Sequence, residues 1–283
     1  TATATTQGIT QSGDLIVGGA TTLVAGATND ITLNRPTNNF NSVVITSGKD
    51  VTLVDANAID LAASSVGGNL IATATTQDLT DSGIVSVTGN ATFTTSNAGD
   101  DILLNSGLAV GGTLSLNTAG AGDATAINAT DINFATSNVG GNLVATATTQ
   151  DITDAGAATV GGNATFTTSA ADADIDLNLL AVAGTLSANT NGTTGNATLV
   201  NTTDIDFAAS NVGGNLTATA TTQNITDTGA ATVGGNASFT TTLADADIDL
   251  NLLAVAGTVA VNTNGSGGDA TLVNTTDLNL AAS

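Results

Sequence analysis

The stretch Asn215-Leu216-Thr217-Ala218-Thr219-Ala220-Thr221-Thr222-Gln223 contains the pattern that decides the fold of this chain. Its apolar residues Leu216, Ala218 and Ala220 alternate with threonines, and a period of two is typical of a β-strand with one buried face. The last six letters, A-T-A-T-T-Q, occur four times, ending at Gln7, Gln77, Gln150 and Gln223. The near-constant spacing of these copies, with the last three evenly placed, predicts a stacked array of repeats and not a single globular core.

A shorter rhythm lies inside each repeat, at an apolar residue that usually follows an aspartate. These anchors are Ile9, Ile31, Ile59, Leu79, Ile102, Ile132, Ile152, Ile175, Ile205, Ile225, Ile248 and Leu278. In the last three repeats a short, a medium and a long step between anchors recur in the same order, so we expect about twelve coils, one of them longer in each repeat. The extra residues fall in glycine-rich stretches near residues 119–122, 191–195 and 264–268, as expected of a surface insertion.

Like residues recur from coil to coil, so that they would stack on one another as they do in a parallel β-helix. A sandwich would instead have a turn about every 8–12 residues without a strict long period. The left-handed hexapeptide helix needs uniform coils, which these steps do not provide. We therefore predict an all-β, right-handed parallel β-helix (β-solenoid) over residues 1–283, with super-repeats at roughly 1–65, 66–138, 139–211 and 212–283.

The composition suits a narrow core. The 283 residues include six Phe and no Cys, Met, Trp, Tyr or His, so Ala, Val, Ile and Leu must fill most of the interior. Five of the phenylalanines recur at the spacing of the long repeat: Phe93, Phe166 and Phe239 in one series, and Phe134 and Phe207 in another. A sugar-stacking platform is one interpretation of these rings, but their inward positions on alternating strands favour the core.

The charge is strongly one-sided. All 24 acidic residues are Asp, only Arg35 and Lys49 are basic, and the net charge is −22. Such a balance argues against nucleic acid or an anionic membrane surface as a partner, because both require basic side chains. We also expect no membrane insertion, since no apolar run reaches spanning length.

Aspartates in every coil raise the question of catalysis on acidic polysaccharides. Glycosidases need a carboxyl pair of which one has a raised pKa, and lyases need a base with basic groups to hold the substrate. The chain has no His or Tyr, and both basic residues lie in the first repeat. Identical placement in each coil indicates architecture, so we expect no enzyme activity and no required cofactor.

The same aspartates could bind a cation. In the D-I-D motif two carboxylates flank one inward Ile and should face outward. We expect Asp174 and Asp176 to lie beside Asp204 and Asp206 of the next coil, about 5 Å away. Calcium would relieve the repulsion between them, because it accepts several carboxylate oxygens in flexible geometry. The alternative is that each Asp caps its own corner through backbone N–H groups.

Outward threonines supply an alternative binding surface, for ice or for a glycan. The outward position on the strand after each V-G-G-type corner is Thr73, Thr94, Asn117, Thr146, Thr167, Asn189, Thr219, Thr240 and Asn262. Asn interrupts the row at every third coil, which weakens a match to a regular lattice. Thr is also the ordinary polar choice for an exposed strand.

Several segments resemble the repeat region of filamentous haemagglutinin-like exoproteins, and the resemblance covers essentially the whole chain. They are residues 29–34, 38–40, 45–53 and 55–61, with the V-G-G-N-L and I-T-D-S-G-type runs. The resemblance implies a long right-handed β-helix in a secreted bacterial surface adhesin, exported by two-partner secretion with an outer-membrane partner. The secretion domain of that family has no counterpart here.

We therefore expect a non-catalytic stalk or filament segment, located outside the cell or on its surface. Both ends of the sequence fall at a repeat boundary. This predicts either that the array continues in a longer chain or that copies of the chain stack end to end.

Overall fold

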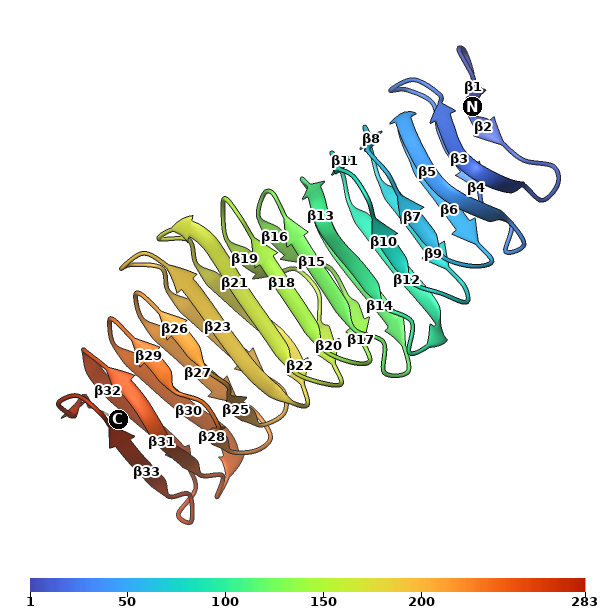
Figure 1. Cartoon of the computed structure of the whole chain (residues 1–283). Coiled ribbons are helices and arrows are strands. Elements are labelled where there is room, and N and C mark those ends of the chain that lie inside the picture. Colours follow the sequence, from blue (N-terminus) through green and yellow to red (C-terminus); the bar gives the residue numbers. More distant parts are fainter. Residues whose placement is uncertain (283) are drawn as a thin grey trace. The chain divides into compact units, whose positions relative to one another are not determined.

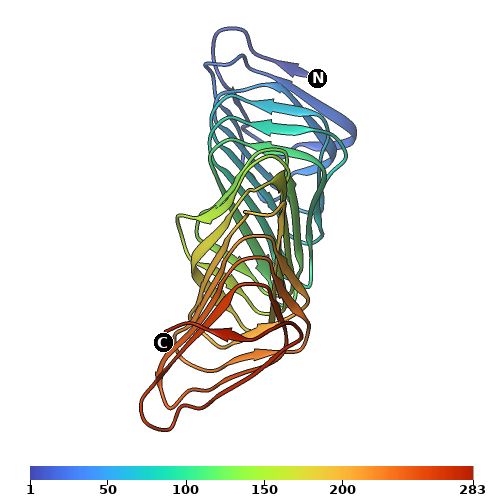
Figure 2. The same cartoon turned by 90° about the vertical axis from the view of Figure 1, so that its left-hand side faces the viewer.

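The computed structural model describes residues 1–282, which contain β-strands and turns and no helix. The strands form two compact units, residues 1–142 and 143–283. Within each unit the paired strands run parallel, as in the pairs β9–β12 and β27–β30. Figure 1 shows the strands of each unit side by side, and Figure 2 shows the backbone of each unit winding coil after coil. The predicted all-β parallel solenoid is therefore confirmed.

The first unit has two sheets. One contains β1 (Ala2–Thr3), β3 (Ile16–Val24), β5 (Asn39–Ser47), β7 (Ile59–Leu61), β8 (Ser64–Val66), β10 (Leu79–Asp81), β11 (Val85–Val87), β13 (Ile102–Val110) and β15 (Ala124–Asn128). The other contains β2 (Ile9–Thr10), β4 (Ile31–Leu33), β6 (Val51–Asp55), β9 (Leu70–Ala74), β12 (Ala91–Ala98), β14 (Thr113–Ala119), β16 (Ile132–Phe134) and β17 (Ser137–Val139). The chain thus alternates between two sheets as it advances.

The second unit repeats this plan. Its β18 sheet contains β18 (Leu143–Ala147), β21 (Ala164–Ala171), β23 (Thr185–Asn191), β25 (Ile205–Phe207), β26 (Ser210–Val212), β28 (Ile225–Asp227), β29 (Ala231–Val233), β31 (Ile248–Val255) and β33 (Ala270–Asn274). Its β22 sheet contains β19 (Ile152–Asp154), β20 (Ala158–Val160), β22 (Ile175–Val182), β24 (Ala197–Asn201), β27 (Leu216–Ala220), β30 (Ala237–Ala244), β32 (Thr258–Asn264) and β34 (Asn279–Leu280).

The core of each unit lies between its two sheets and is filled by the inward rows of Ala, Val, Ile, Leu and Phe. The five phenylalanines of the two repeated series are completely buried, and Phe40 is 3% exposed, so the core interpretation of these rings is confirmed. In the second unit the rings of Phe207 and Phe239 meet edge to face, with centroids 6.0 Å apart. This geometry is favourable for aromatic pairs and joins one sheet to the other.

The register of stacked strands gives the length of one coil in the second unit. Leu216 pairs with Ala197 of the preceding coil and with Ala237 of the following coil. The number of residues between such paired positions is the length of one coil, and the long sequence repeat is not a whole multiple of it. Strands β18 and β27 carry the same motif one super-repeat apart, yet they lie in opposite sheets of the unit. One super-repeat contains three and a half coils.

The predicted placement of the coils differs from the structure for this reason. The long step from Ile175 to Ile205 was expected to be one coil with an inserted loop. In the structure Ile175 pairs with Ala197, and Ile205 lies in the opposite sheet, half a coil further on. The solenoid has about 13 turns, close to the twelve or so that were expected. The glycine-rich stretch at 191–195 is the ordinary turn between β23 and β24.

Candidate functional surface

A ladder of side-chain oxygens runs along one corner of the second unit. The Oδ1 atom of Asp174 accepts the backbone N–H of Asn196 in the next coil at 2.7 Å. Asn196 accepts from Asn215 at 2.9 Å, and Asn215 accepts from Asn236 at 2.8 Å, in the same way. Asn236 ends the series by accepting the N–H of Thr258 at 2.8 Å. Each side chain thus replaces a carbonyl oxygen where the turn interrupts the backbone ladder.

The first unit has two such ladders. One links Asp30, Asp50, Asn69, Asn90 and Thr113, and the other links Asp78, Asp101, Asp123 and Asn142. The bond from the Asn69 N–H is the main cause that holds the pKa of Asp50 below its usual value. Carboxylate and amide serve equally here, because each contributes one accepting oxygen.

The predicted arrangement of the four calcium ligands is wrong. Asp174 directly precedes β22 and Asp176 lies in it. Asp204 directly precedes β25 and Asp206 lies in it, and β25 is in the opposite sheet. Asp176 is paired with Thr153 and Thr198, and Asp206 with Thr185 and Thr226. Half a coil of rotation separates the two pairs. Among the described residues, no group of three or more acidic side chains is placed to hold a metal ion.

Of the two explanations offered for the aspartates, the structure supports capping, with one change. Asp174 was expected to cap the corner of its own coil. Its carboxylate instead receives the N–H and the side-chain amide of Asn196, which belongs to the following coil. The bonds therefore connect coils and do not only close turns.

Asp174 and Asp176 do lie together in a shallow, open groove on the second unit. Its other polar lining residues are Asn196, Thr198, Asn215 and Thr217, and its volume is about 320 Å³. The side-chain amide of Asn178 donates to Asp176 Oδ1. The groove offers carboxylate, amide and hydroxyl groups for hydrogen bonding.

The threonines form rows at successive coils, but on two sheets. In the β18 sheet Thr146 pairs with Thr167, which pairs with Asn189. In the β22 sheet Thr219 pairs with Thr240, which pairs with Asn262. The expected single threonine face of the second unit is therefore divided into two short rows by the half coil in each repeat.

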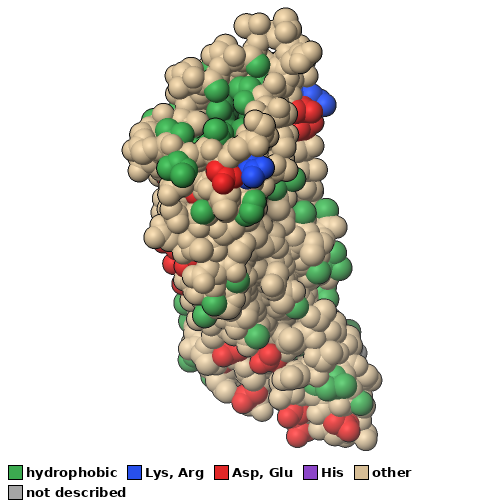
Figure 3. Space-filling model, turned by 90° about the vertical axis from the view of Figure 1, so that its right-hand side faces the viewer, with side chains coloured by type: hydrophobic (Ala, Val, Ile, Leu, Met, Phe, Trp, Pro, Cys, Tyr) green, Lys and Arg blue, Asp and Glu red, His purple; other side chains and the backbone are tan. Residues whose placement is uncertain are grey.

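The two basic side chains are on the surface of the first unit. Arg35 Nε lies 2.6 Å from Asp14 Oδ1, and Lys49 Nζ lies 3.1 Å from Asp50 Oδ2. Figure 3 shows these groups in blue beside red carboxylates, with the neutral polar surface in tan. Exposed pairs of this kind contribute little to stability.

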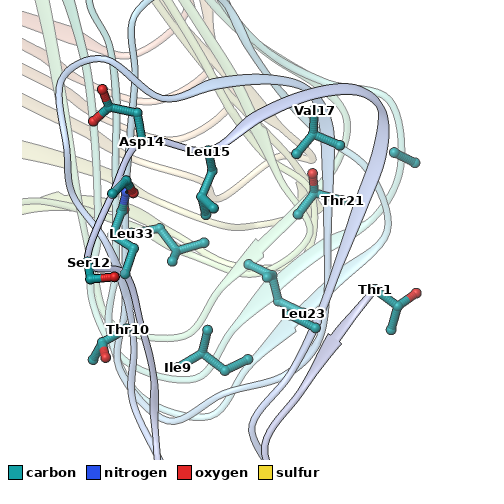
Figure 4. Close-up of a pocket in the computed structure, with 14 residues that line it drawn as sticks. Thr1, Ile9, Thr10, Ser12, Asp14, Leu15, Val17, Thr21, Leu23 and Leu33 are labelled. Atoms are coloured by element: carbon teal, nitrogen blue, oxygen red, sulfur yellow. The ribbon is translucent and has the colours of Figure 1, made fainter.

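A cavity of about 460 Å³ lies in the first coils of the first unit (Figure 4). Its wall includes Ile9, Leu15, Val17, Leu23 and Leu33. Leu23 and Leu33 belong to the inward rows that form the core of the unit. The cavity is therefore the interior of the solenoid at its first coil and has the chemistry of a core.

A recurring buried polar position was missed by the sequence analysis. Asp55, Asn128 and Asn201 recur at the spacing of the long repeat and are at most 1% exposed. Asn128 Oδ1 accepts the N–H of Val110, and its Nδ2 donates to the carbonyl of the same residue. A polar residue repeated at the end of an inward strand was the signal that could have identified this position.

Comparison with known proteins gives one finding. A family described as "Repeats of unknown function (DUF5649)" matches residues 1–47, 48–117, 121–180 and 194–254. No curated protein and no solved structure matches the chain. The four matches cover most of the sequence and follow its internal repeat, so the chain belongs to the DUF5649 repeat family.

Proposed function

We propose that this chain is a non-catalytic structural segment of a secreted, adhesin-like surface protein, in which stacked coils act as a stalk. The observation that carries the proposal is the use of the repeated Asp and Asn side chains. Ladder residues such as Asp174, Asn196 and Asn215 bind the backbone of the next coil and so hold the array together. Side chains that recur for this purpose have an architectural role at each position.

The chemistry of the acidic groups supports the non-catalytic part of the proposal. Burial raises the pKa of Asp55, as a general acid would require. That carboxyl is 0% exposed, however, and it accepts the N–H groups of Phe40 and Asn57. A substrate could not reach it without opening the coil.

The pattern of coil-to-coil bonds supports extension of the array. Each coil presents the same kinds of donor and acceptor to the next, so further coils can be added without a new type of contact. We propose that the stalk continues into the remainder of a longer chain or stacks on copies of itself. Resemblance to filamentous haemagglutinin-like exoproteins supports an extracellular or cell-surface location and an outer-membrane secretion partner.

A binding role is the second candidate. It is favoured by the paired polar rows in the β22 sheet, where Thr217 and Thr219 lie in register with Ser238 and Thr240. Such rows, next to the groove at Asp174, could contact a glycan or order water at an ice surface. The two proposals make opposite predictions for the isolated chain.

The test uses the purified chain on a glycan array and in a thermal-hysteresis assay, with electron microscopy of the same sample. The stalk proposal expects no glycan signal and no hysteresis, with single solenoids or solenoids joined end to end. The double variant Thr217→Ala/Thr219→Ala is the control, because both side chains point away from the core. Glycan binding or hysteresis that this variant abolishes would replace the stalk by the binding role.

A further inference from the structure

Two turns of the second unit carry an Asn-Gly pair, and the sequence contains no other. Asn191 ends β23 and Gly192 begins the turn to β24, and Asn264 ends β32 and Gly265 begins the turn to β33. All four residues are exposed. The φ angles of Gly192 and Gly265 are 91° and 87°, a region that residues with a side chain rarely adopt. Glycine is therefore required by the turn, and it also leaves its backbone nitrogen sterically open.

The side chain of Asn191 folds back onto that nitrogen. The N–H of Gly192 donates to Asn191 Oδ1 at 2.9 Å. The carbon of the amide, one bond beyond Oδ1, is therefore held close to the nitrogen of the next residue. Asn191 Nδ2 also donates to the Ser169 carbonyl at 2.7 Å, which fixes the side chain in this orientation. Holding two reacting atoms close together lowers the entropic part of a reaction barrier.

The turn around this pair is itself held in place by a carboxylate. Asp172 Oδ1 accepts the N–H groups of Thr193 and Thr194 at 3.2 and 3.1 Å. In the equivalent turn Asp245 Oδ1 accepts the N–H of Gly267, and Asn264 Nδ2 donates to the Thr242 carbonyl at 2.6 Å. Both Asn-Gly turns thus present an oriented amide on an ordered backbone.

We propose that Asn191 and Asn264 are sites of spontaneous deamidation through a succinimide. The backbone nitrogen of the following glycine loses its proton and attacks Cγ of the asparagine, and a C–N bond forms. The bond from Cγ to Nδ2 breaks, and ammonia leaves with the proton. Water then opens the five-membered ring at either carbonyl, giving aspartate or isoaspartate. No oxidant, reductant or enzyme is needed.

Deamidation would weaken the contact between coils at this corner. The new carboxylate at 191 has no N–H to donate to the Ser169 carbonyl, so two oxygens would face each other where a hydrogen bond stood. It would also add a negative charge to a turn that already holds the Asp172 carboxylate. Isoaspartate would in addition lengthen the backbone of the turn by one carbon.

The first unit supplies a matched control. Its turn between β14 and β15 carries Ala119–Gly120 at the equivalent place, and Gly120 also has a positive φ, of 61°. Alanine has no amide to lose. A glycine of positive φ directly after the last strand residue is thus present with and without the reacting group in one molecule, in turns of similar length.

The experiment is a time course of the folded full-length chain in mildly alkaline buffer, followed by peptide mapping and isoaspartate detection. We expect the mass increase of amide-to-acid conversion in the two peptides that contain Asn191 and Asn264. The peptide with Ala119–Gly120 should stay unchanged. In the variant Asn191→Gln the shift at 191 should be lost while the shift at 264 remains.

An unchanged mass at Asn191 and Asn264 in the folded chain would overturn the proposal, whatever the rate in urea. Conversion at Asn-Ala pairs such as Asn163–Ala164 at the same rate would also overturn it, because the glycine turn would then have no special role. Circular dichroism of the aged samples confirms that the chain remained folded during the reaction.

Discussion

Asp55 in the first unit and Asn201 in the second occupy the same place in the repeat, at the ends of β6 and β24, but they carry different side chains. Both are removed from solvent, at 0% and 1% exposure. A buried polar group must find partners within the protein, because leaving it unpaired costs about 1–3 kcal/mol. The partners of Asp55 and Asn201 therefore explain why each coil has a different side chain at this position.

Asn201 meets a mixed environment of donors and acceptors. Its Oδ1 accepts the N–H of Val182 at 2.8 Å, and its Nδ2 donates to the Val182 carbonyl at 3.0 Å. The same Nδ2 donates to Thr203 Oγ1 at 2.8 Å and to the carbonyl of Asp204. Only an amide can both accept and donate in this way.

Asp55 meets N–H donors on both oxygens. Phe40 donates to Oδ2 at 2.7 Å, and Asn57 donates to Oδ1 at 2.9 Å. The neighbouring carbonyl of Val54 is covered by a second buried amide, Asn38, at 3.2 Å. An acceptor-only side chain fits here because another residue supplies the donor. Burial is the largest cause of the raised pKa of Asp55, and these bonds oppose it.

The largest expected effect comes from exchanging the side chain in the second unit. Asn201→Asp places a carboxylate against the carbonyls of Val182 and Asp204, and we expect it to lower the free energy of unfolding by about 3–5 kcal/mol at neutral pH. Urea unfolding measures the loss. Asn128→Asp should behave alike, whereas Asn215→Asp, which keeps its accepting role toward the Asn236 N–H at an exposed corner, should change stability by less than about 0.5 kcal/mol.

The reverse exchange in the first unit should change the pH dependence of stability. A raised folded pKa means that the folded chain holds its proton longer than the unfolded chain. The contribution of Asp55 is therefore fully present below its ordinary pKa of 3.8 and is lost as pH rises through the folded pKa. Asp55→Asn has no such loss. The free energy of unfolding of the variant should therefore rise relative to that of wild type as pH rises from about 4.

Unfolding of both proteins over a series of pH values checks this result. Asp50 and Asp172, whose pKa values are lowered by hydrogen bonds, act in the opposite direction and lose their contribution as pH falls. They are present in both proteins, so the difference isolates Asp55. A difference that is flat from acid to neutral pH would mean that burial does not perturb this carboxyl.

A smaller effect is expected at the corner ladder of the second unit, where Asp174 is half-buried. Asp174→Ala removes the acceptor for the Asn196 N–H and should cost about 1 kcal/mol. Asp174→Asn keeps an accepting oxygen and should be within about 0.5 kcal/mol of wild type. Thermal and urea unfolding of the two variants compare them. Equal losses would show that charge, and not the coil-to-coil bond, is what this position contributes.

The smallest expected effect is that of chelation. The predicted carboxylate group at Asp174, Asp176, Asp204 and Asp206 does not exist as a group, since its members lie in opposite sheets. We therefore expect the same melting temperature with EDTA and with calcium. A calcium-dependent rise that Asp176→Asn removes would mean that the groove on the second unit binds the ion.

Much of the fold could be predicted from the sequence because alternation is a local property. Leu216, Ala218 and Ala220 show directly which side of a strand is buried. The rotation between Ile175 and Ile205 is not local, since residue counts do not tell how far the chain has turned around the axis. The chain makes one and a half coils between them, which becomes readable once the length of a single coil is known from stacked pairs such as Leu216 and Ala237.

The candidate surface was less predictable for a related reason. The D-I-D motif correctly indicates that Asp174 and Asp176 accompany an inward Ile, and Ile175 is 1% exposed. Two aspartates of successive motifs become neighbours only when their strands lie in the same sheet, and the motif does not reveal the sheet. The buried position of Asn201 is harder still to predict, because its partners include backbone groups of Val182, in the preceding coil.

The half coil in each super-repeat has a consequence for how such a chain can grow by duplication. Inserting one more copy of the super-repeat into the second unit would transfer every strand after it to the opposite sheet. Whatever followed would then emerge on the other side of the axis, while all contacts between coils stayed the same. Two copies would restore the original direction. Adding an even number of repeats would therefore leave unchanged the side of the axis on which the following chain emerges. Adding an odd number would move that chain to the opposite side.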